Sequence, residues 1–398
     1  MYTWFSQGFA ILARTGGQVK TAHCLGAGEN ESAAQYARGA LQLGILFAVL
    51  YGLVSIFGAS RLIGFFKLNS PEVIAQAEWY VRIACGLVIF SYLNAILTGL
   101  LTAAGNSRTP FIVNVAGLVF NVVLDPVLIF GIGPFPELGV SGAAAATVTA
   151  QALVSLLFFK AVLREKVLFP HLRLWVLVPV KVWREIVRIG VPSAVQNLIY
   201  AGISMILTRL ITGWGDLAVA AQRVGSQIES VSWMVGDGFS AAVNAFLGQN
   251  YGAKRYDRVR RGYFCAIAMT AAWGLCTTFL LIGMARPLFS IFLQEEEVMA
   301  IGVNYLRIVG LSQMFMMVEQ TSIGAFSGLG RTLYPSIISV TFTSARIPVA
   351  VLLSSVMGLS GIWWALSISS MVKGCILFVS FVVFLYVFLE RKKDEKTV

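Results

Sequence analysis

Four carboxylates occur within long apolar stretches of this sequence, which is an unusual place for negative charge. They are Asp125, Glu229, Asp237 and Glu319. An ionised side chain in such a stretch costs free energy, and one that is retained there usually binds a cation, carries a proton or pairs with a buried cation. These residues are therefore the first candidates for chemistry.

Asp125 has the most complete set of neighbouring polar groups. Asn121 precedes it by one helical turn, so both side chains share a helix face. Pro126 lacks an amide hydrogen and leaves the carbonyl of Val122 without its helical partner. A carboxylate, an amide oxygen and a free carbonyl suit Na+ at Asp125, or a proton. The alternative is a structural Asp125 that is held by helix-packing hydrogen bonds or that caps the segment.

The other three acids are spread over two apolar segments. Glu229 and Asp237 lie on roughly one face of the same predicted helix, and Glu319 lies on a later one. We expect them to take part in cation or proton coupling. Structural salt bridges are an equal alternative, because several cations occur in or near the same segments. These cations are Arg209, Arg223, Arg307, Arg346 and Lys373.

The composition identifies the elements that must position these groups. The chain has 398 residues, of which 57% are hydrophobic and only 12% charged. Soluble domains carry about twice that share of charge, so the sequence predicts an all-α integral membrane protein. No nucleotide-binding GxxxxGK[ST] motif occurs, and the five cysteines are scattered without a CxxC pair. We expect a protein that is not an enzyme and binds no cofactor other than H+ or Na+ as a coupling ion.

Stretches of about 20 apolar residues define the predicted transmembrane helices. We expect about eleven of them. They are Tyr2–Ala22, Gln35–Ala59, Val81–Ala103, Phe111–Ile132, Val140–Leu163, Ile189–Thr212, Ala218–Phe246, Tyr263–Met284, Val298–Phe326, Ser336–Val356 and Ile362–Leu389.

Basic residues set the predicted orientation of these helices. Alternate loops and the C-terminal tail hold most of the Lys and Arg, including the run Lys254–Arg261, whereas the opposite loops hold only Arg61, Lys67 and Arg286. Basic short loops remain cytoplasmic. We therefore expect a multi-pass protein of the cell (inner) membrane with a cytoplasmic C-terminus. The net charge of +11 is explained in this way, without nucleic acid as a partner.

The two halves of the chain repeat each other. Glu72 matches Glu297 and Pro110 matches Pro335 at one constant offset. The segment near Ile189, which begins the second half, has no counterpart after Met1. We therefore expect a parallel six-plus-six design whose first helix is missing. The expected divisions are an N-terminal lobe (1–163), a cytoplasmic inter-lobe loop (164–188), a C-terminal lobe (189–390) and a cytoplasmic tail (391–398).

Several segments resemble the multidrug and toxic compound extrusion (MATE) family. These are GQNYGAKRYDRVRRG at 248–262, GNSRTP at 105–110, NVVLDP at 121–126 and GPFPELG at 133–139. The resemblance runs from about Tyr2 to Glu390. It implies two six-helix lobes around a cavity and a secondary antiporter, which exports organic and often cationic compounds in exchange for H+ or Na+.

The resemblance also implies roles for particular residues. Asn121 and Asp125 match the cation site of the family's first lobe, and we expect Thr147 to join them. The missing helix would supply a carboxylate to this site in some branches of the family. Other branches place an acid on the seventh helix, where this chain has Asn197 and Tyr200.

The remaining site predictions concern substrate contact and the inner loop. We expect Asn197, Tyr200, Trp233 and Met316 to line the substrate cavity, because aromatic and Met side chains adapt to flat hydrophobic compounds. Filler that faces lipid is the alternative for any one of them. The inner-loop motif of Gly248, Gln249 and Gly252 predicts a tight turn, with a cytoplasmic gate as the alternative.

Two other functions fit the same sequence. One is a flippase for lipid-linked oligosaccharide of related architecture, which would need several cations in its cavity to hold a diphosphate. The other is a truncated fragment that does not transport. The partners expected for the main hypothesis are small hydrophobic or cationic organic compounds and the lipid bilayer, with the protein as a monomer.

Overall fold

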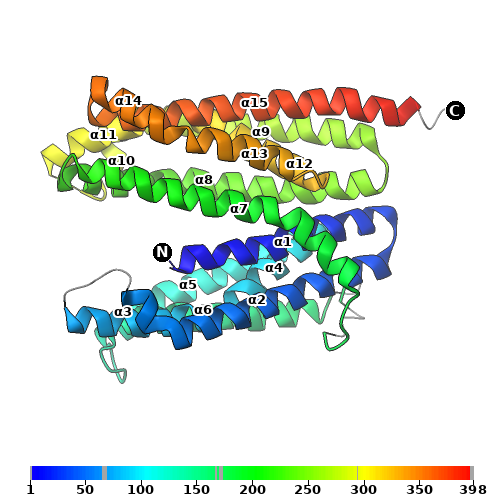
Figure 1. Ribbon diagram of the computed structural model, residues 1–398, viewed down its shortest axis with the longest axis horizontal. Coiled ribbons are helices and arrows are strands. Elements are labelled where there is room, and N and C mark those ends of the chain that lie inside the picture. The colour runs from blue at the N-terminus through cyan, green and yellow to red at the C-terminus, as the bar shows by residue number, and fades with distance from the viewer. Residues whose placement is uncertain (1, 65–69, 166–167, 170–173, 294, 395–398) are drawn as a thin grey trace. The chain divides into compact units, whose positions relative to one another are not determined.

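The computed structural model describes the chain except for residues 1, 65–69, 166–167, 170–173, 294 and 395–398. Lys67 and part of the expected inter-lobe loop and tail therefore lie outside the described residues. The described chain folds into α-helices without a strand (Figure 1). The helices are α1 (Tyr2–Ala27), α2 (Asn30–Gly64), α3 (Pro71–Ala84), α4 (Ile89–Ala103), α5 (Arg108–Phe130), α6 (Gly139–Val162), α7 (Val180–Thr212), α8 (Asp216–Gly252), α9 (Tyr256–Gly283), α10 (Ala285–Ser290), α11 (Glu296–Gly310), α12 (Gln313–Gly328), α13 (Leu333–Ser344), α14 (Arg346–Met357) and α15 (Leu359–Asp394).

Each expected transmembrane segment coincides with a helix or with a pair of consecutive helices. By length and composition, seven helical segments among the described residues are apolar enough to cross a membrane, with α13 and α14 counted together as one. Two bent pairs, α3 with α4 and α11 with α12, bring the number to nine. The other two expected segments are α1 and α8, which are 26 and 37 residues long but more polar. The all-helical membrane architecture is therefore confirmed.

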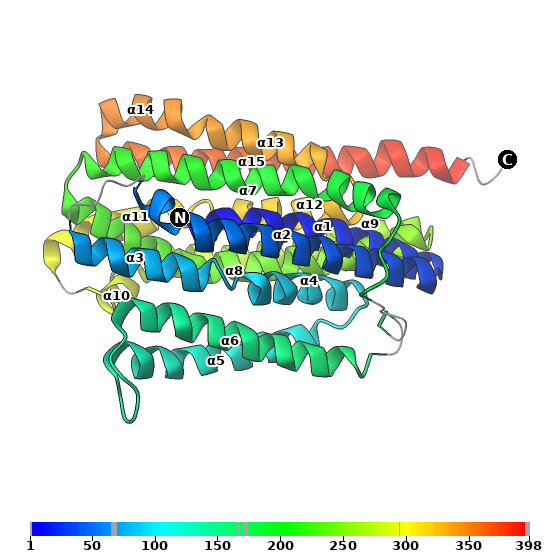
Figure 2. The ribbon, with the colours of Figure 1, turned by 60° about the horizontal axis from the view of Figure 1, so that its bottom comes forward.

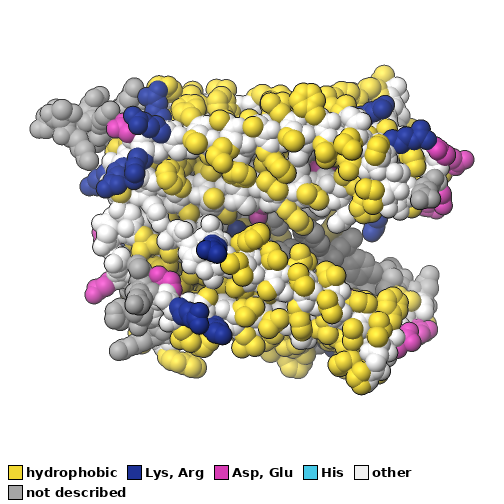
Figure 3. Space-filling model, turned by 180° about the vertical axis from the view of Figure 1, so that it is seen from behind, with side chains coloured by type: hydrophobic (Ala, Val, Ile, Leu, Met, Phe, Trp, Pro, Cys, Tyr) yellow, Lys and Arg dark blue, Asp and Glu magenta, His cyan; other side chains and the backbone are white. Residues whose placement is uncertain are grey.

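The surface of the described chain is typical of a protein surrounded by lipid. Figure 3 shows hydrophobic side chains over most of the visible face, with most of the charged side chains near its two ends. Large apolar residues on α5 illustrate this exposure: Phe111, Leu118 and Val122 are more than 60% exposed. Such a surface would be unstable in water but matches hydrocarbon.

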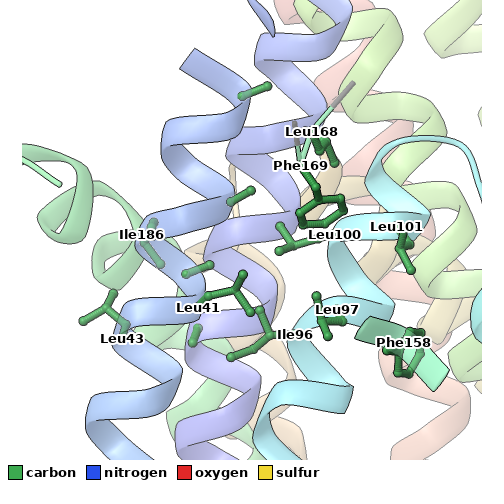
Figure 4. Close-up of a cluster of buried hydrophobic side chains, with 14 of the residues drawn as sticks. Leu41, Leu43, Ile96, Leu97, Leu100, Leu101, Phe158, Leu168, Phe169 and Ile186 are labelled. Atoms are coloured by element: carbon green, nitrogen blue, oxygen red, sulfur yellow. The ribbon is translucent and has the colours of Figure 1, made fainter. Parts of the chain in front are cut away.

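The chain divides into two compact units, Met1–Ala194 and Val195–Val398. Figures 1 and 2 show the helices of each unit lying side by side. The first unit is built around a core of aliphatic and aromatic side chains from α1, α2, α4, α6 and the segment that follows α6. Figure 4 shows Ile96, Leu100 and Phe158 in this core.

The segment between α6 and the start of the second unit packs on the first unit. Gln42 donates from Nε2 to the carbonyls of Leu174 and Val176, at 2.9 Å each. Lys20 pairs with Glu185 at 2.6 Å. Helix α7 begins at Val180, before the expected transmembrane segment, and the boundary between the units falls within this helix.

The internal repeat is visible in the backbone. The two bent pairs occupy matching positions, with bends of 42° and 50°. The turns after α4 and α12 also match: Gly105 and Gly330 both have positive φ angles, of 85° and 72°. In each turn this glycine donates its amide to a carbonyl three residues earlier, in the helix-ending arrangement that favours glycine. The two halves are therefore built on the same local plan.

Candidate functional site

Glu229 is half-buried in α8 and accepts two hydrogen bonds from the bent pair α11 and α12. The hydroxyl of Tyr305 donates to Oε2 at 3.0 Å, and Nε2 of Gln313 donates to Oε1 at 3.2 Å. The ring of Tyr305 packs edge-on against Trp363 and lies directly over Gly225, one turn before Glu229. Because a Cβ atom at Gly225 would clash with that ring, the glycine allows Tyr305 to approach the carboxylate.

A second acid of this unit forms a buried ion pair. Glu319 in α12 accepts from Nζ of Lys373 in α15 at 2.7 Å, and the two side chains are 8% and 5% exposed. The salt-bridge alternative therefore describes this acid in the structure. Removing two charges from water is costly, and such a pair needs close geometry to persist.

Arg346 is the other buried cation of this unit. It is the first residue of α14 and is only 7% exposed. Its Nε donates to the hydroxyl of Ser369 and its Nη2 to that of Ser370, at 3.0 Å each, and its guanidinium carbon lies 6.0 Å from the ring centre of Tyr200. Tyr200 lies within electrostatic range of Arg346, Glu229 and Glu319. Arg346 is thus the charged group in contact with this tyrosine, and Glu229 and Glu319 act on it at longer range.

The first unit has a neutral counterpart to the Glu319–Lys373 pair. At the offset that pairs Glu72 with Glu297, Asn94 in α4 takes the position of Glu319. Asn94 is 4% exposed and bonds to α6, donating at 2.8 Å to the backbone and side-chain oxygens of Gln151 and accepting at 2.8 Å from Ser155. Uncharged side chains therefore join the corresponding helices in the first unit.

Asp125 and Asn121 lie together on α5, as predicted. Both are half-buried, and Nδ2 of Asn121 donates to Oδ1 of Asp125 at 3.2 Å. A cation held by both side chains would require the amide to turn its oxygen toward Asp125. Thr147 on α6 is exposed and donates to the carbonyl of Ala143 in its own helix at 2.9 Å. Helices α5 and α6 pack as neighbours, but no contact of Thr147 with the acid is observed in the described chain.

The other predicted site residues are less closely grouped. Asp237 is exposed on α8, so it does not share the surroundings of Glu229. Tyr200 and Trp233 are 42% and 38% exposed, whereas Met316 is buried at 7%. Asn197 is half-buried on α7, one turn before Tyr200. Of these, Tyr200 contacts a charged group described above, the guanidinium of Arg346.

The inner-loop motif forms the last turns of α8 and leads into a tight turn at Ala253 and Lys254. Gly248 is buried within the last turns of the helix, which ends at Gly252. Lys254 adopts a positive φ of 55°, and its amide donates to the carbonyl of Tyr251 at 3.0 Å. Gln249 accepts from the amide of Ala253 through its own carbonyl at 2.9 Å. The tight turn therefore lies just after Gly248, Gln249 and Gly252, which are themselves helical.

Sequence reasoning did not single out the partners of the acids. Tyr305 and Gln313 stand 76 and 84 residues from Glu229, and nothing local marks them. Arg346 and Lys373 were named only among several cations near the predicted helices. For Lys373 the repeat contained a usable signal. The first half has the neutral Asn94 at the position of Glu319, so the second half carries an additional negative charge there, and this charge needs a cationic partner.

Charged side chains held inside a bundle of apolar helices define a multi-pass membrane protein with an internal polar site, as transporters have. The family model MatE matches residues 1–127 and 192–352. The chain belongs to the MatE family, whose members are transporters and not enzymes.

Relatives and solved structures agree with this assignment. The chain is 30% identical over 375 residues to the "Probable multidrug resistance protein NorM" of Thermotoga maritima, covering 90% of this chain and 78% of that protein. It is 27% identical to the "FAD transporter" of Shewanella oneidensis, covering 92% and 81%. An outward-facing multidrug resistance MATE family transporter of the MOP superfamily has the same fold, with a TM-score of 0.90 and 21% identity over 98% of this chain and 86% of that one.

Proposed function

We propose that this chain is a secondary active antiporter that exports small organic compounds, cationic ones included, in exchange for H+ or Na+. The observation that carries the proposal is Glu229, an acid within an apolar helix bundle that is held by Tyr305 and Gln313. Family membership and the resemblance to NorM of Thermotoga maritima support it. The proposed setting is the inner membrane, with a monomer, the bilayer as its surroundings and a cytoplasmic C-terminus.

The coupling proposed for Glu229 depends on its charge. An ionised Glu229 attracts a cationic substrate, whereas a proton or Na+ on the carboxylate cancels that attraction. Because a charged and a neutralised site favour different packing, ion binding can bias the protein between conformations. Asp125 with Asn121 offers a similar arrangement in the first unit, where Asn121 donates to the carboxylate at 3.2 Å. We assign coupling to both acids.

The test is dye export by the purified full chain in proteoliposomes. Ethidium is the cationic probe, and a pH gradient or a Na+ gradient is imposed separately. Glu229→Gln and Asp125→Asn keep the shape of each side chain but remove its charge. We expect each variant to lose at least about tenfold of the gradient-driven rate while its thermal unfolding stays within a few degrees of the parent.

Asp216→Asn is the matched control, because Asp216 is an exposed acid at the start of the same helix as Glu229. It should export at the parental rate. Parental export by both Glu229→Gln and Asp125→Asn would reject coupling through these acids. A parent chain that exports no dye under either gradient would contradict the antiporter itself and favour the non-transporting alternative.

A flippase for lipid-linked oligosaccharide is the second candidate function. The observation that favours it is the presence of two buried cations in the second unit, Arg346 and Lys373. Cationic side chains can hold a diphosphate. Lys373 is already paired with Glu319, however, which leaves one cation for that role. Movement of a fluorescent diphosphate lipid between leaflets, without ethidium export, would favour this function.

A further inference from the structure

Arg346 is a buried cation whose direct partners are all neutral. It is 7% exposed, bonds to the hydroxyls of Ser369 and Ser370, and lies beside the ring of Tyr200. None of the ion pairs found in the described residues includes it. A buried charge without a counter-charge is costly, so positions of this kind mark functional sites within membrane proteins.

The two nearby acids are already engaged by other groups. Glu319 accepts from Lys373 at 2.7 Å. Glu229 accepts from Tyr305 and Gln313 at 3.0 and 3.2 Å. These acids balance the local charge at longer range, but neither places an oxygen on the guanidinium of Arg346. Since the hydrogen bonds to Ser369 and Ser370 use only part of its N–H groups, the guanidinium retains donors for another acceptor.

Joining α14 to α15 does not by itself require a guanidinium. A neutral amide could donate to two serine hydroxyls, and the first unit joins its helices with neutral groups such as Asn94 and Gln151. At the offset that pairs Glu72 with Glu297, the neutral Asn121 of the first unit takes the position of Arg346, and Asp125 stands one helical turn after it. The first unit thus has a neutral side chain where the second unit buries Arg346.

We propose that Arg346 binds an anionic group, a carboxylate or a phosphate, of an organic compound that this protein transports. Tyr200 is 42% exposed and faces the guanidinium, so an aromatic body can stack on the ring while its anionic group reaches Arg346. The inference rests on the proposed transport function and extends its substrates from organic cations to organic anions. The anionic group belongs either to a soluble compound or to a lipid headgroup.

The test is equilibrium binding to the purified full chain in phosphatidylcholine nanodiscs. Carboxyfluorescein is the anionic probe and ethidium the cationic one, and both are followed by fluorescence polarisation. Arg346→Gln should weaken carboxyfluorescein binding at least about tenfold, as expected for the loss of a charge-assisted contact. Ethidium binding should remain within about twofold of the parent or become tighter. Arg346→Lys should retain part of the anion affinity.

Arg307→Gln is the matched control, since Arg307 is an exposed arginine of the same unit. It should bind both probes as the parent does. Tyr200→Leu tests the site without altering the buried charge, and it should weaken carboxyfluorescein binding by about threefold even if Arg346→Gln fails to fold. Equal carboxyfluorescein binding by the parent, Tyr200→Leu and every folded Arg346 variant would overturn the proposal.

Two further measurements are needed. The first distinguishes a lipid headgroup from a soluble compound as the source of the anionic group, and the second distinguishes failure of this inference from failure of the antiporter proposal. If phosphatidic acid in the nanodisc displaces carboxyfluorescein from the parent but not from Arg346→Lys, the group that is recognised is a lipid phosphate; without displacement it belongs to a soluble compound. Gradient-driven ethidium export without any anion binding would reject this inference and leave the antiporter standing. Anion binding that depends on Arg346, without export of either dye, would reject the antiporter and leave this inference standing.

Discussion

At the scale of single residues, the second unit differs from the first by the charges it buries. Asn94 and Glu319 occupy matching positions, and each bonds to a later helix of its own unit, α6 for Asn94 and α15 for Glu319. The neutral contact satisfies its polar groups without removing a charge from water. The Glu319–Lys373 pair also joins two helices, but at a higher desolvation cost. This cost indicates that the charge at position 319 serves more than helix packing.

Replacing one partner of the Glu319–Lys373 pair should lower the free energy of unfolding more than replacing both partners. Lys373→Met leaves Glu319 buried without a partner and should destabilise the protein by about 3 kcal/mol. The double variant with Glu319→Gln should be more stable than Lys373→Met alone, because no uncompensated charge remains. Thermal unfolding in detergent, followed by tryptophan fluorescence, measures both. A double variant that is less stable than Lys373→Met would contradict this account.

The contacts that could be predicted at this scale were the local ones. Asn121 and Asp125 stand one helical turn apart, so helix geometry alone places them together, and the structure shows the hydrogen bond between them. Glu229 and Tyr305 meet only because helices distant in sequence pack side by side. Asp237 was expected on the face of Glu229, but it is exposed, since a long helix contacts different neighbours along its length.

At the scale of elements, α7 depends on glycine for its close packing in the first unit. Gly190 lies against the backbone of Leu12 in α1, and Gly16 of α1 lies against the backbone of Ile186. Helices in membranes commonly approach through small residues in this way, because lipid offers them little hydrophobic driving force to associate. The opposite end of α7 has more space around Gly202, where a Cβ would meet nothing within 4 Å.

Two substitutions on α7 should therefore act in opposite directions. Gly190→Ala inserts a methyl group against the backbone of α1 and should destabilise the protein by about 1–3 kcal/mol. Gly202→Ala has the same chemistry in open space and should be neutral or stabilising by up to about 1 kcal/mol. Their unfolding midpoints in detergent compare the two directly. Equal effects would indicate that α7 does not pack closely at Gly190.

The helices were predictable from the length of the apolar stretches, but the bends that divide two of these stretches into separate helices were not. Every expected segment is helical, yet no sequence pattern indicated that α3 and α4, or α11 and α12, are separate helices. The second break falls at Leu311 and Ser312, with no proline nearby to signal it. The repeat does connect the two breaks, since they fall at matching positions, so knowledge of one would have located the other.

At the scale of the whole molecule, the basic loops should determine the orientation in the membrane. The run from Lys254 to Arg261 lies in the turn and first residues after α8, and its basic side chains are exposed. The segment 134–137 lies in the loop between α5 and α6, at the other end of α5 from Arg108. Basic loops remain on the cytoplasmic side.

Cysteine labelling of intact cells checks this orientation. In a background that lacks the five native cysteines, Phe135→Cys should react with a membrane-impermeant maleimide from outside. Arg258→Cys should react only after the cells are permeabilised. Both residues are exposed, so accessibility within the protein does not bias the comparison. Labelling of both positions from the same side would overturn the assignment of the transmembrane segments.

The position of Lys373 in the last helix has a consequence for how the protein is made. A chain enters the membrane in the order of its synthesis, so α12 and α14 arrive before α15 exists. Until then Glu319 lacks its lysine, and Arg346 lacks the hydroxyls of Ser369 and Ser370. Nascent chains that stop short of α15 should therefore hold two unsatisfied charges in the bilayer, which makes them targets for membrane proteases. Completion of α15 is the step that commits the second half to its folded form.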